Sequence, residues 1–178
     1  NVPMVEGAFK KIMEQNRVTI IDLLHAEGWK AEIAASYVYA NSVAIQQADA
    51  IMCGNDDLAT QVVRALAESR QAGDILVVGQ DADLAACQRI VEGTQLMTVY
   101  KPVERLATRA AEASVALGRG EMLSGEDVTV MESGGYTVPY IGLEPISVNR
   151  DNMDEVIIGS GFHLKEDVYL NAPDQMPQ

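Results

Sequence analysis

The chain has 178 residues, nearly half of them hydrophobic, and its 26 acidic residues outnumber 13 Lys and Arg residues to give a formal net charge of −13. This length suits one domain, or most of one, with a sizeable core. The acidic balance argues against a nucleic-acid-binding surface, which needs clustered Lys and Arg. No apolar run approaches the roughly 18 residues that suggest a membrane span.

The first part of the chain alternates predicted helices and strands. Residues 3–16 have an amphipathic pattern typical of a helix, and the β-branched, apolar residues 18–24 predict a strand. A long helix is expected over 31–47 and a strand over 48–53. The following helix shows its buried side as three apolar residues in helical spacing, Leu58, Val62 and Leu66.

Residues 74–101, DILVVGQDADLAACQRIVEGTQLMTVYK, form the most clearly patterned unit. The unbroken apolar run 75–78 is typical of a strand buried on both faces. Residues 82–92 predict a helix that Gly93 ends, because glycine readily adopts the positive φ of a helix stop. Residues 94–100 predict a second strand, so the whole stretch is one β-α-β unit.

Each strand of this unit is followed by a charged residue. Gly79 and Gln80 are expected to turn the chain, which places Asp81 at the carboxyl end of the first strand, and Lys101 follows the second. In open parallel sheets, ligands bind outside the carboxyl ends of the strands. The unit therefore predicts half of a small-molecule cleft.

The remainder of the chain is less regular. A helix is expected over 103–117, strands over 128–131 and 140–148 on either side of a Ser-Gly-Gly sequence, and a short helix over 151–158. Residues 171–178 hold two prolines and no apolar pattern, which predicts a flexible tail. The alternation of helices and strands predicts an α/β fold, a doubly wound parallel sheet with helices on both faces.

The string VVGQDADLAACQRIVEGTQLMTVYKPV resembles the D-xylose-binding group of type I periplasmic binding proteins, the substrate-binding subunits of sugar ABC transporters. Those proteins carry a very similar GQDADLA string followed by GTQ.MTVYKP. Shorter matches extend the resemblance to about Leu170, and they are Gly28-Trp29, Ile51 to Asp56, Pro145 to Asn149 and Gly161 to His163.

The resemblance implies that the chain is one lobe of a two-lobed type I periplasmic-binding-protein fold. Residues 1–98 would form the carboxyl-terminal, sugar-binding lobe, and 99–125 the hinge crossing with a helix that packs on an amino-terminal lobe absent from this chain. Residues 126–170 would be return strands and the terminal helix, before the tail 171–178. The exposed apolar side of the helix 103–117 would then need a partner.

The function implied is capture of D-xylose or a similar monosaccharide, by closure of two lobes, for delivery to the membrane permease of an ABC transporter. Such a protein is periplasmic, or extracellular and membrane-anchored as a lipoprotein. It is not an enzyme, has no cofactor and binds no nucleic acid. Two alternatives stay open: an extracytoplasmic sugar sensor coupled to a membrane histidine kinase, and the effector-binding core of a transcription regulator of the same fold.

The resemblance also implies sugar-binding roles for residues that have ordinary structural explanations. Trp29, the only tryptophan, belongs either to the core or to a stacking platform for the apolar face of a sugar ring. Asn55 either caps a helix or offers an amide that donates to and accepts from hydroxyls. If Asn55 binds, Asp56 and its neighbour Asp57 are the expected caps. The last candidate in this part, Asn1, aligns weakly with a family ligand.

Asp81 and Lys101 pose the same choice between a structural and a binding role. Asp81 is either a helix cap or a carboxylate that accepts charge-assisted hydrogen bonds from two hydroxyls. Asp83 would then be the acidic residue of the first helical turn. Lys101 is either solvated or a donor of up to three hydrogen bonds to the sugar.

No pattern in the chain indicates a catalyst or a metal site. His25 and His163 stand apart from any nucleophile motif, and the glycine-rich nucleotide-binding signatures are absent. Cys53 and Cys87 lie in apolar surroundings with no metal-ligand spacing, so both are expected to be small buried side chains. A disulfide between them stays open.

Overall fold

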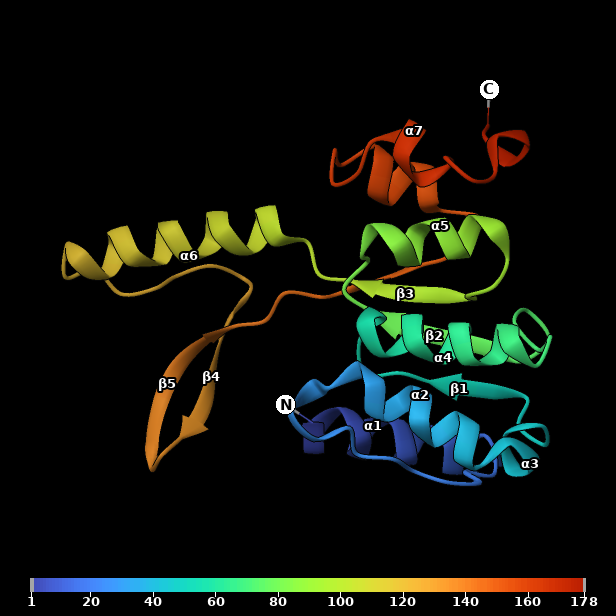
Figure 1. The fold of residues 1–178 in the computed structure, drawn as a ribbon. Helices are drawn as coiled ribbons and strands as arrows, with labels where there is room; N and C mark the ends of the chain where they lie inside the picture. The colour runs from blue at the N-terminus through green and yellow to red at the C-terminus, as the bar shows by residue number, and fades with distance from the viewer. Residues whose placement is uncertain (1, 178) are drawn as a thin grey trace. The chain divides into compact units, whose positions relative to one another are not determined.

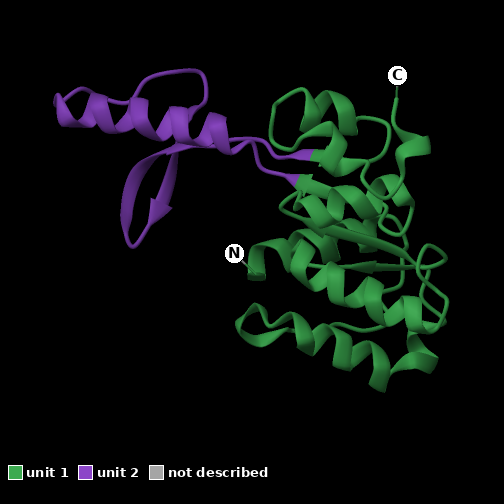
Figure 2. Ribbon diagram, turned by 45° about the horizontal axis from the view of Figure 1, so that its top comes forward, with its two compact units in different colours: residues 1–99, 147–178 green, residues 100–146 purple. Residues whose placement is uncertain are grey.

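The structure is a computed structural model that describes residues 2–177. The chain divides into two compact units, residues 1–99 with 147–178 and residues 100–146 (Figure 2). The residues from Ser147 onward, which the sequence grouped with the return strands, are therefore part of the first unit. The assignment of these units to lobes of a larger protein stays a prediction.

A four-stranded sheet with the order β1-β2-β3-β6 supports the first unit (Figure 1). The pairs β1–β2 and β2–β3 are parallel, with Ile51 opposite Val77 and Gly79 opposite Thr98. This confirms the predicted α/β fold with a parallel sheet. The strands are β1 Ala50–Met52, β2 Leu76–Gln80, β3 Met97–Tyr100 and β6 Ile146–Val148.

Helices of the first unit pack in pairs around the sheet, α2 against α4 and α5 against α7. Leu66 of α4 and Val77 of β2 are completely buried, as the apolar spacing predicted. The expectation that the run 75–78 is buried on both faces is wrong, because Leu76 is exposed. The predicted helices before β1 and inside the β-α-β unit are confirmed. The bounds are α1 Val2–Gln15, α2 Ala31–Ala40, α3 Ser42–Ile45, α4 Asp56–Glu68, α5 Leu84–Glu92 and α7 Lys165–Val168.

The strand predicted over 18–24 is wrong, because these residues have no regular secondary structure. Val18 and Ile21 are 50% and 54% exposed, so their apolar side chains are not packed as in a sheet. β-Branched residues favour strands only when a neighbouring strand pairs with them. In this structure β1 is an edge strand whose neighbour is β2, and 18–24 does not pair with it.

Two local boundaries also differ from the sequence-based expectation. The helix expected over 31–47 breaks at Asn41, where φ is −116° and the side-chain amide donates to the carbonyl of Tyr37 at 3.0 Å. Such a bond lets Asn compete with the regular helical pattern. The turn expected at Gly79 and Gln80 is wrong, because β2 continues through Gln80 and the chain turns only at Asp81.

The carboxyl-terminal part of the first unit contains short helical segments. The helix expected over 151–158 is a π-helical turn, Asp154–Ile158, in which Ile157 is buried. Asn149 accepts from the backbone N–H of Asp151 at 2.8 Å, as expected of a residue that begins a turn. Within the predicted tail, Pro173–Gln175 forms a 3₁₀ turn.

The second unit consists of one helix, α6 Val103–Gly118, and one hairpin of antiparallel strands. The strands are β4 Val128–Ser133 and β5 Tyr136–Ile141. Gly134 and Gly135 form the turn, both with positive φ, which explains the Ser-Gly-Gly sequence. The strand expected over 140–148 is therefore two strands, β5 and β6, separated by Gly142 to Pro145.

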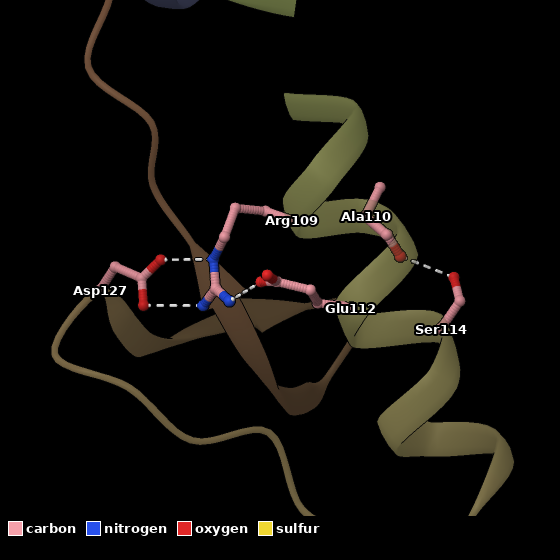
Figure 3. A network of polar contacts seen from close by, with 5 residues as sticks. All are labelled: Arg109, Ala110, Glu112, Ser114 and Asp127. Atoms are coloured by element: carbon pink, nitrogen blue, oxygen red, sulfur yellow. Dashed lines mark hydrogen bonds and ion pairs between the residues drawn. The ribbon is translucent and has the colours of Figure 1, made fainter. Parts of the chain in front are cut away.

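A bidentate ion pair joins α6 to the start of this hairpin (Figure 3). Arg109 donates through Nε and Nη2 to the two carboxylate oxygens of Asp127, both at 2.8 Å, and through Nη1 to Glu112. Two parallel hydrogen bonds between a guanidinium and a carboxylate fix the relative orientation of the two groups in addition to pairing their charges. None of the residues of α6 is buried, and Leu106 and Leu117 on its apolar side are 56% and 59% exposed.

No helix among the described residues has both the length and the apolar content needed to cross a membrane.

Replacing Leu66 by Ala should strongly destabilise the first unit. Leu66 is completely buried between α4 and the sheet, so its removal leaves a cavity that costs about 2–5 kcal/mol in the free energy of unfolding. Urea unfolding measures the loss. Leu76→Ala is the control, because Leu76 is 43% exposed and should cost less than about 1 kcal/mol. Equal losses in the two variants would contradict the described core.

Candidate ligand-binding site

The candidate site lies at the carboxyl ends of the parallel strands. Gly54 and Asn55 follow β1, and Asp81 follows β2, which pairs with β1 in parallel. Because parallel strands end at the same edge of a sheet, these residues share one edge, the edge where open α/β sheets bind ligands. Lys101 directly follows β3 and belongs to the second unit. Asn1 lies outside the described residues.

Trp29 lies against the end of β1. It closes a short 3₁₀ turn, Glu27–Trp29, in which Gly28 and Trp29 both have positive φ. A Cβ placed on Gly54 would be 2.9 Å from Cζ3 of Trp29, so the indole ring covers the glycine. The side chain is nonetheless 44% exposed. Trp29 is thus not part of the buried core, and its ring offers a surface beside Asn55.

Asn55 caps helix α4. Its side-chain Oδ1 accepts a hydrogen bond from the backbone N–H of Leu58 at 2.9 Å, the usual arrangement of an N-cap residue. The expectation that Asp56 and Asp57 provide the caps is therefore wrong. Because Oδ1 of Asn55 already accepts this hydrogen bond, Nδ2 is the group of the side chain better placed to bind a ligand.

Asp81 begins a turn with unusual backbone geometry. Its φ is 108° and that of Ala82 is 56°, although neither residue is glycine. A positive φ in a non-glycine residue costs on the order of 1–3 kcal/mol and persists only when surrounding contacts hold it. The backbone N–H of Asp81 donates to the carbonyl of Val99 at 2.9 Å, which ties the turn to β3.

Side chains from three parts of the chain hold the remainder of this turn. The N–H of Ala82, a completely buried residue, donates to Oγ1 of Thr98 at 3.1 Å. The N–H of Asp83 donates to Oδ2 of Asp56 at 3.1 Å. From the carboxyl-terminal segment, Nε2 of His163 donates to the carbonyl of Ala82 at 2.8 Å. Asp81 is consequently presented by a turn that is fixed along its length.

A buried polar network lies directly beneath the turn. Asp56, Thr98 and Gln95 are 0%, 0% and 3% exposed. Asp56 accepts from Thr98 Oγ1 at 2.8 Å and from Gln95 Nε2 at 2.9 Å, and Gln95 Oε1 accepts from Arg89 Nε at 3.0 Å. Sequence reasoning missed this network. Its one local signal is Gly79, since a glycine inside a strand often marks the close approach of another group.

Burial dominates the electrostatics of these groups. Removal from water raises the pKa of Asp56, an effect that hydrogen bonds from Gln95, Thr98 and the Asp83 N–H oppose. Burial, followed by the charges of Asp57 and Asp81, raises the pKa of Asp83. The strand ends therefore concentrate hydrogen-bond acceptors and negative charge.

Both cysteines are buried and free, as expected of small apolar side chains. Burial is the first cause that raises the pKa of each thiol, Cys53 and Cys87, to about 12. Neither is therefore a thiolate at neutral pH. Among residues 2–177, no group of three or more His, Cys, Asp and Glu side chains is arranged to hold a metal ion.

One hollow of the first unit lies away from the carboxyl ends of the strands. Its volume is about 240 Å³, and its lining includes Leu76, Leu96 and Arg150. Arg150 is already engaged there, because its Nη2 donates to the carbonyl of Val91. The indole, amide and carboxylate groups at the strand ends provide the better binding chemistry, since they combine an apolar face with oriented donors and acceptors.

Residues 1–122 match the model of the periplasmic binding protein domain. The chain is 36% identical over 173 residues to the D-xylose-binding periplasmic protein of Haemophilus influenzae, and the match covers 89% of this chain and 51% of that protein. The Escherichia coli protein of the same name is 35% identical over 163 residues, with 89% and 48% covered. The chain thus spans about half the length of the curated relatives it matches.

A solved structure of a similar protein agrees with these sequence matches. A carbohydrate transporter solute-binding protein from Chloroflexus aurantiacus, determined in complex with D-glucose, has a TM-score of 0.65 and 29% sequence identity to the chain. The match covers 77% of this chain and 40% of that protein.

Replacing Gly54 by Ala should displace the indole ring of Trp29. The new Cβ would lie 2.9 Å from Cζ3, too close for the ring to stay in place. Because Trp29 is the only tryptophan, the fluorescence of this chain reports on that ring alone, and both its emission maximum and its quenching by acrylamide should change. Gly118→Ala is the control, since nothing lies within 4 Å of a Cβ there. Identical spectra for wild type and Gly54→Ala would refute the packing of Trp29 on β1.

Proposed function

The chain belongs to the periplasmic binding protein family, and from this premise we propose that it captures D-xylose, or a closely similar monosaccharide, for import by an ABC transporter. Two relatives at 35–36% identity are named D-xylose-binding periplasmic proteins. The Chloroflexus aurantiacus protein was determined with a bound sugar. These names and the match of the fold support the proposal.

The observation that carries the proposal is the chemistry gathered at the strand ends. An exposed indole ring lies beside the amide that follows β1, and a carboxylate on a fixed turn follows the neighbouring strand β2. A pyranose needs this combination, because its C–H face is apolar while its edge is lined with hydroxyl groups.

Each proposed ligand has a distinct task. Trp29 stacks on the apolar face of the sugar ring, and Asp81 accepts charge-assisted hydrogen bonds from two hydroxyls. The Nδ2 of Asn55 donates to a sugar oxygen while its Oδ1 stays on the helix cap. Lys101 donates to the sugar from the end of β3. Asn1 is the weakest of the proposed contacts.

The proposed mechanism is closure of two lobes around the sugar. Ligand contacts made only in the closed form would shift the population of open and closed forms toward the closed one. The first unit supplies one lobe, and the exposed apolar side of α6 is suited to packing against the other. The proposed location is the periplasm, or the outer face of a membrane to which a lipid anchor attaches the protein, where a permease receives the sugar.

Full-length protein should bind D-xylose more tightly than D-ribose or D-glucose. The residues that carry the preference are those of the string shared with the xylose-binding group, Asp81 and Lys101 above all. Isothermal titration calorimetry with the three sugars measures the order of affinities. No heat with D-xylose, together with clear binding of an unrelated solute, would exclude the proposed function.

In the full-length protein, Asp81→Ala should weaken D-xylose binding at least about ten times more than Asn55→Ala. Losing a charged hydrogen bond costs about 1.5–3 kcal/mol, and Asp81 is proposed to make two, whereas Asn55 donates neutral bonds. Calorimetry compares the affinities, and thermal unfolding shows that both variants are folded.

The same pair of variants separates binding from capping. Asn55→Ala should lower the melting temperature, because loss of an N-cap costs about 1 kcal/mol of stability. Asp81→Ala should stay folded, so that its loss of binding does not reflect unfolding. Normal D-xylose binding by Asp81→Ala would remove Asp81 from the site.

A further inference from the structure

We propose that Asp56 is a positioning residue of the sugar site: its buried carboxylate fastens the Asp81–Asp83 turn to the start of α4 and to β3, and so sets the direction of Asp81. The inference rests on the proposed function, because it assigns Asp56 to the same site. Asp56 itself is completely buried and is not a ligand.

The contacts of Asp56 connect the start of α4, the turn after β2, and β3. Asp56 is the first residue of α4, the helix that follows β1. Its Oδ2 accepts from the N–H of Asp83 at 3.1 Å and from Oγ1 of Thr98 in β3 at 2.8 Å. The same Thr98 hydroxyl accepts from the N–H of Ala82 at 3.1 Å. Two consecutive amides of the turn are thus held by this pair of side chains.

The turn needs such support because its backbone is strained. Asp81 and Ala82 both have positive φ, which non-glycine residues keep only when surrounding contacts enforce it. The direction of the Asp81 side chain depends on this backbone. If the amides of Ala82 and Asp83 lose their acceptors, the turn can relax and Asp81 moves away from the ligand.

A carboxylate is required at position 56 because it meets donors on both oxygens. Oδ1 accepts from Nε2 of Gln95 at 2.9 Å, and Gln95 is itself oriented by Arg89, which donates to its Oε1 at 3.0 Å. An asparagine at this position would direct its NH₂ group either at Gln95 Nε2 or at the N–H of Asp83. Each orientation sets a donor against a donor in a buried place.

Two further observations separate this role from helix capping. Asn55 already caps α4, so the cap does not explain the burial of Asp56. Gly79 leaves room for the carboxylate: a Cβ there would be 2.1 Å from Asp56 Oδ1. By contrast, the adjacent Asp57 is exposed and makes none of these bonds, which makes it a matched control.

The experiment compares Asp56→Asn with Asp57→Asn in the full-length protein by calorimetry with D-xylose. Asp56→Asn should weaken binding at least about tenfold, the effect of misplacing one charged ligand, and Asp57→Asn should stay within about twofold of wild type. Thr98→Val, which removes the shared hydroxyl, should resemble Asp56→Asn, and Thr98→Ser should restore binding. The Thr98 variants decide the question if Asp56→Asn does not fold.

A double-mutant cycle with Asp81→Asn distinguishes positioning from general stability. If Asp56 acts through Asp81, Asp56→Asn should weaken D-xylose binding less than about threefold in a protein that already carries Asp81→Asn. The reason is that the effects of two substitutions are not additive when the residues interact. An unchanged tenfold cost in the Asp81→Asn background would overturn the proposal.

Amide hydrogen exchange tests the same inference without any ligand. Exchange at Ala82 and Asp83 should be at least about tenfold faster in Asp56→Asn than in Asp57→Asn, since Asp83 loses its carboxylate acceptor and Thr98, the acceptor for Ala82, loses the carboxylate that orients its hydroxyl. Unchanged exchange would overturn the positioning role even if D-xylose binds. Faster exchange in a protein that binds no D-xylose would instead support the positioning role and reject the proposed sugar.

Discussion

The burial of one carboxylate is the constraint on which the strand-end region depends. Asp56 begins α4, after β1, and its oxygens receive hydrogen bonds from Asp83 after β2, from Gln95 before β3 and from Thr98 within β3. Burying a charge is costly unless donors surround it. Because these donors come from separate segments, the network fixes the relative positions of the strand ends. The side chains that face outward from this edge therefore rest on a rigid base.

The sequence predicted well those elements whose signal is local. The apolar run before Asp81, the stop at Gly93 and the helical spacing that includes Leu66 each reflect neighbours within one or two turns of chain. The segment 18–24 has an equally apolar composition but no strand partner in the structure, and pairing is a non-local property that composition does not contain. The division of the second unit into α6 and a hairpin followed from its glycines.

The candidate site was partly predictable for the same reason. Asp81 and Asn55 became candidates because they follow predicted strands, and Trp29 because it is the only tryptophan, while their binding roles came from the family resemblance and stay predictions. Asp56 was taken for a helix cap, since its hydrogen-bond partners lie 27, 39 and 42 residues away and no spacing rule connects them. Only the fold shows that the residue next to the cap faces inward.

The engagement of Asn55 by helix α4 affects which sugar derivatives the proposed site would admit. Its oxygen already accepts the N–H of Leu58 through one of its two lone pairs, and its Nδ2 group is the part of the side chain that can donate to a ligand. The Asp81 carboxylate, when ionised, can only accept. A ligand must therefore present a lone pair to one position and a hydroxyl hydrogen to the other. A methyl ether at an oxygen beside Asp81 would lack the hydrogen that the carboxylate accepts, whereas an ether oxygen beside Asn55 could still accept from Nδ2, so the two positions would differ in the ligand groups they favour.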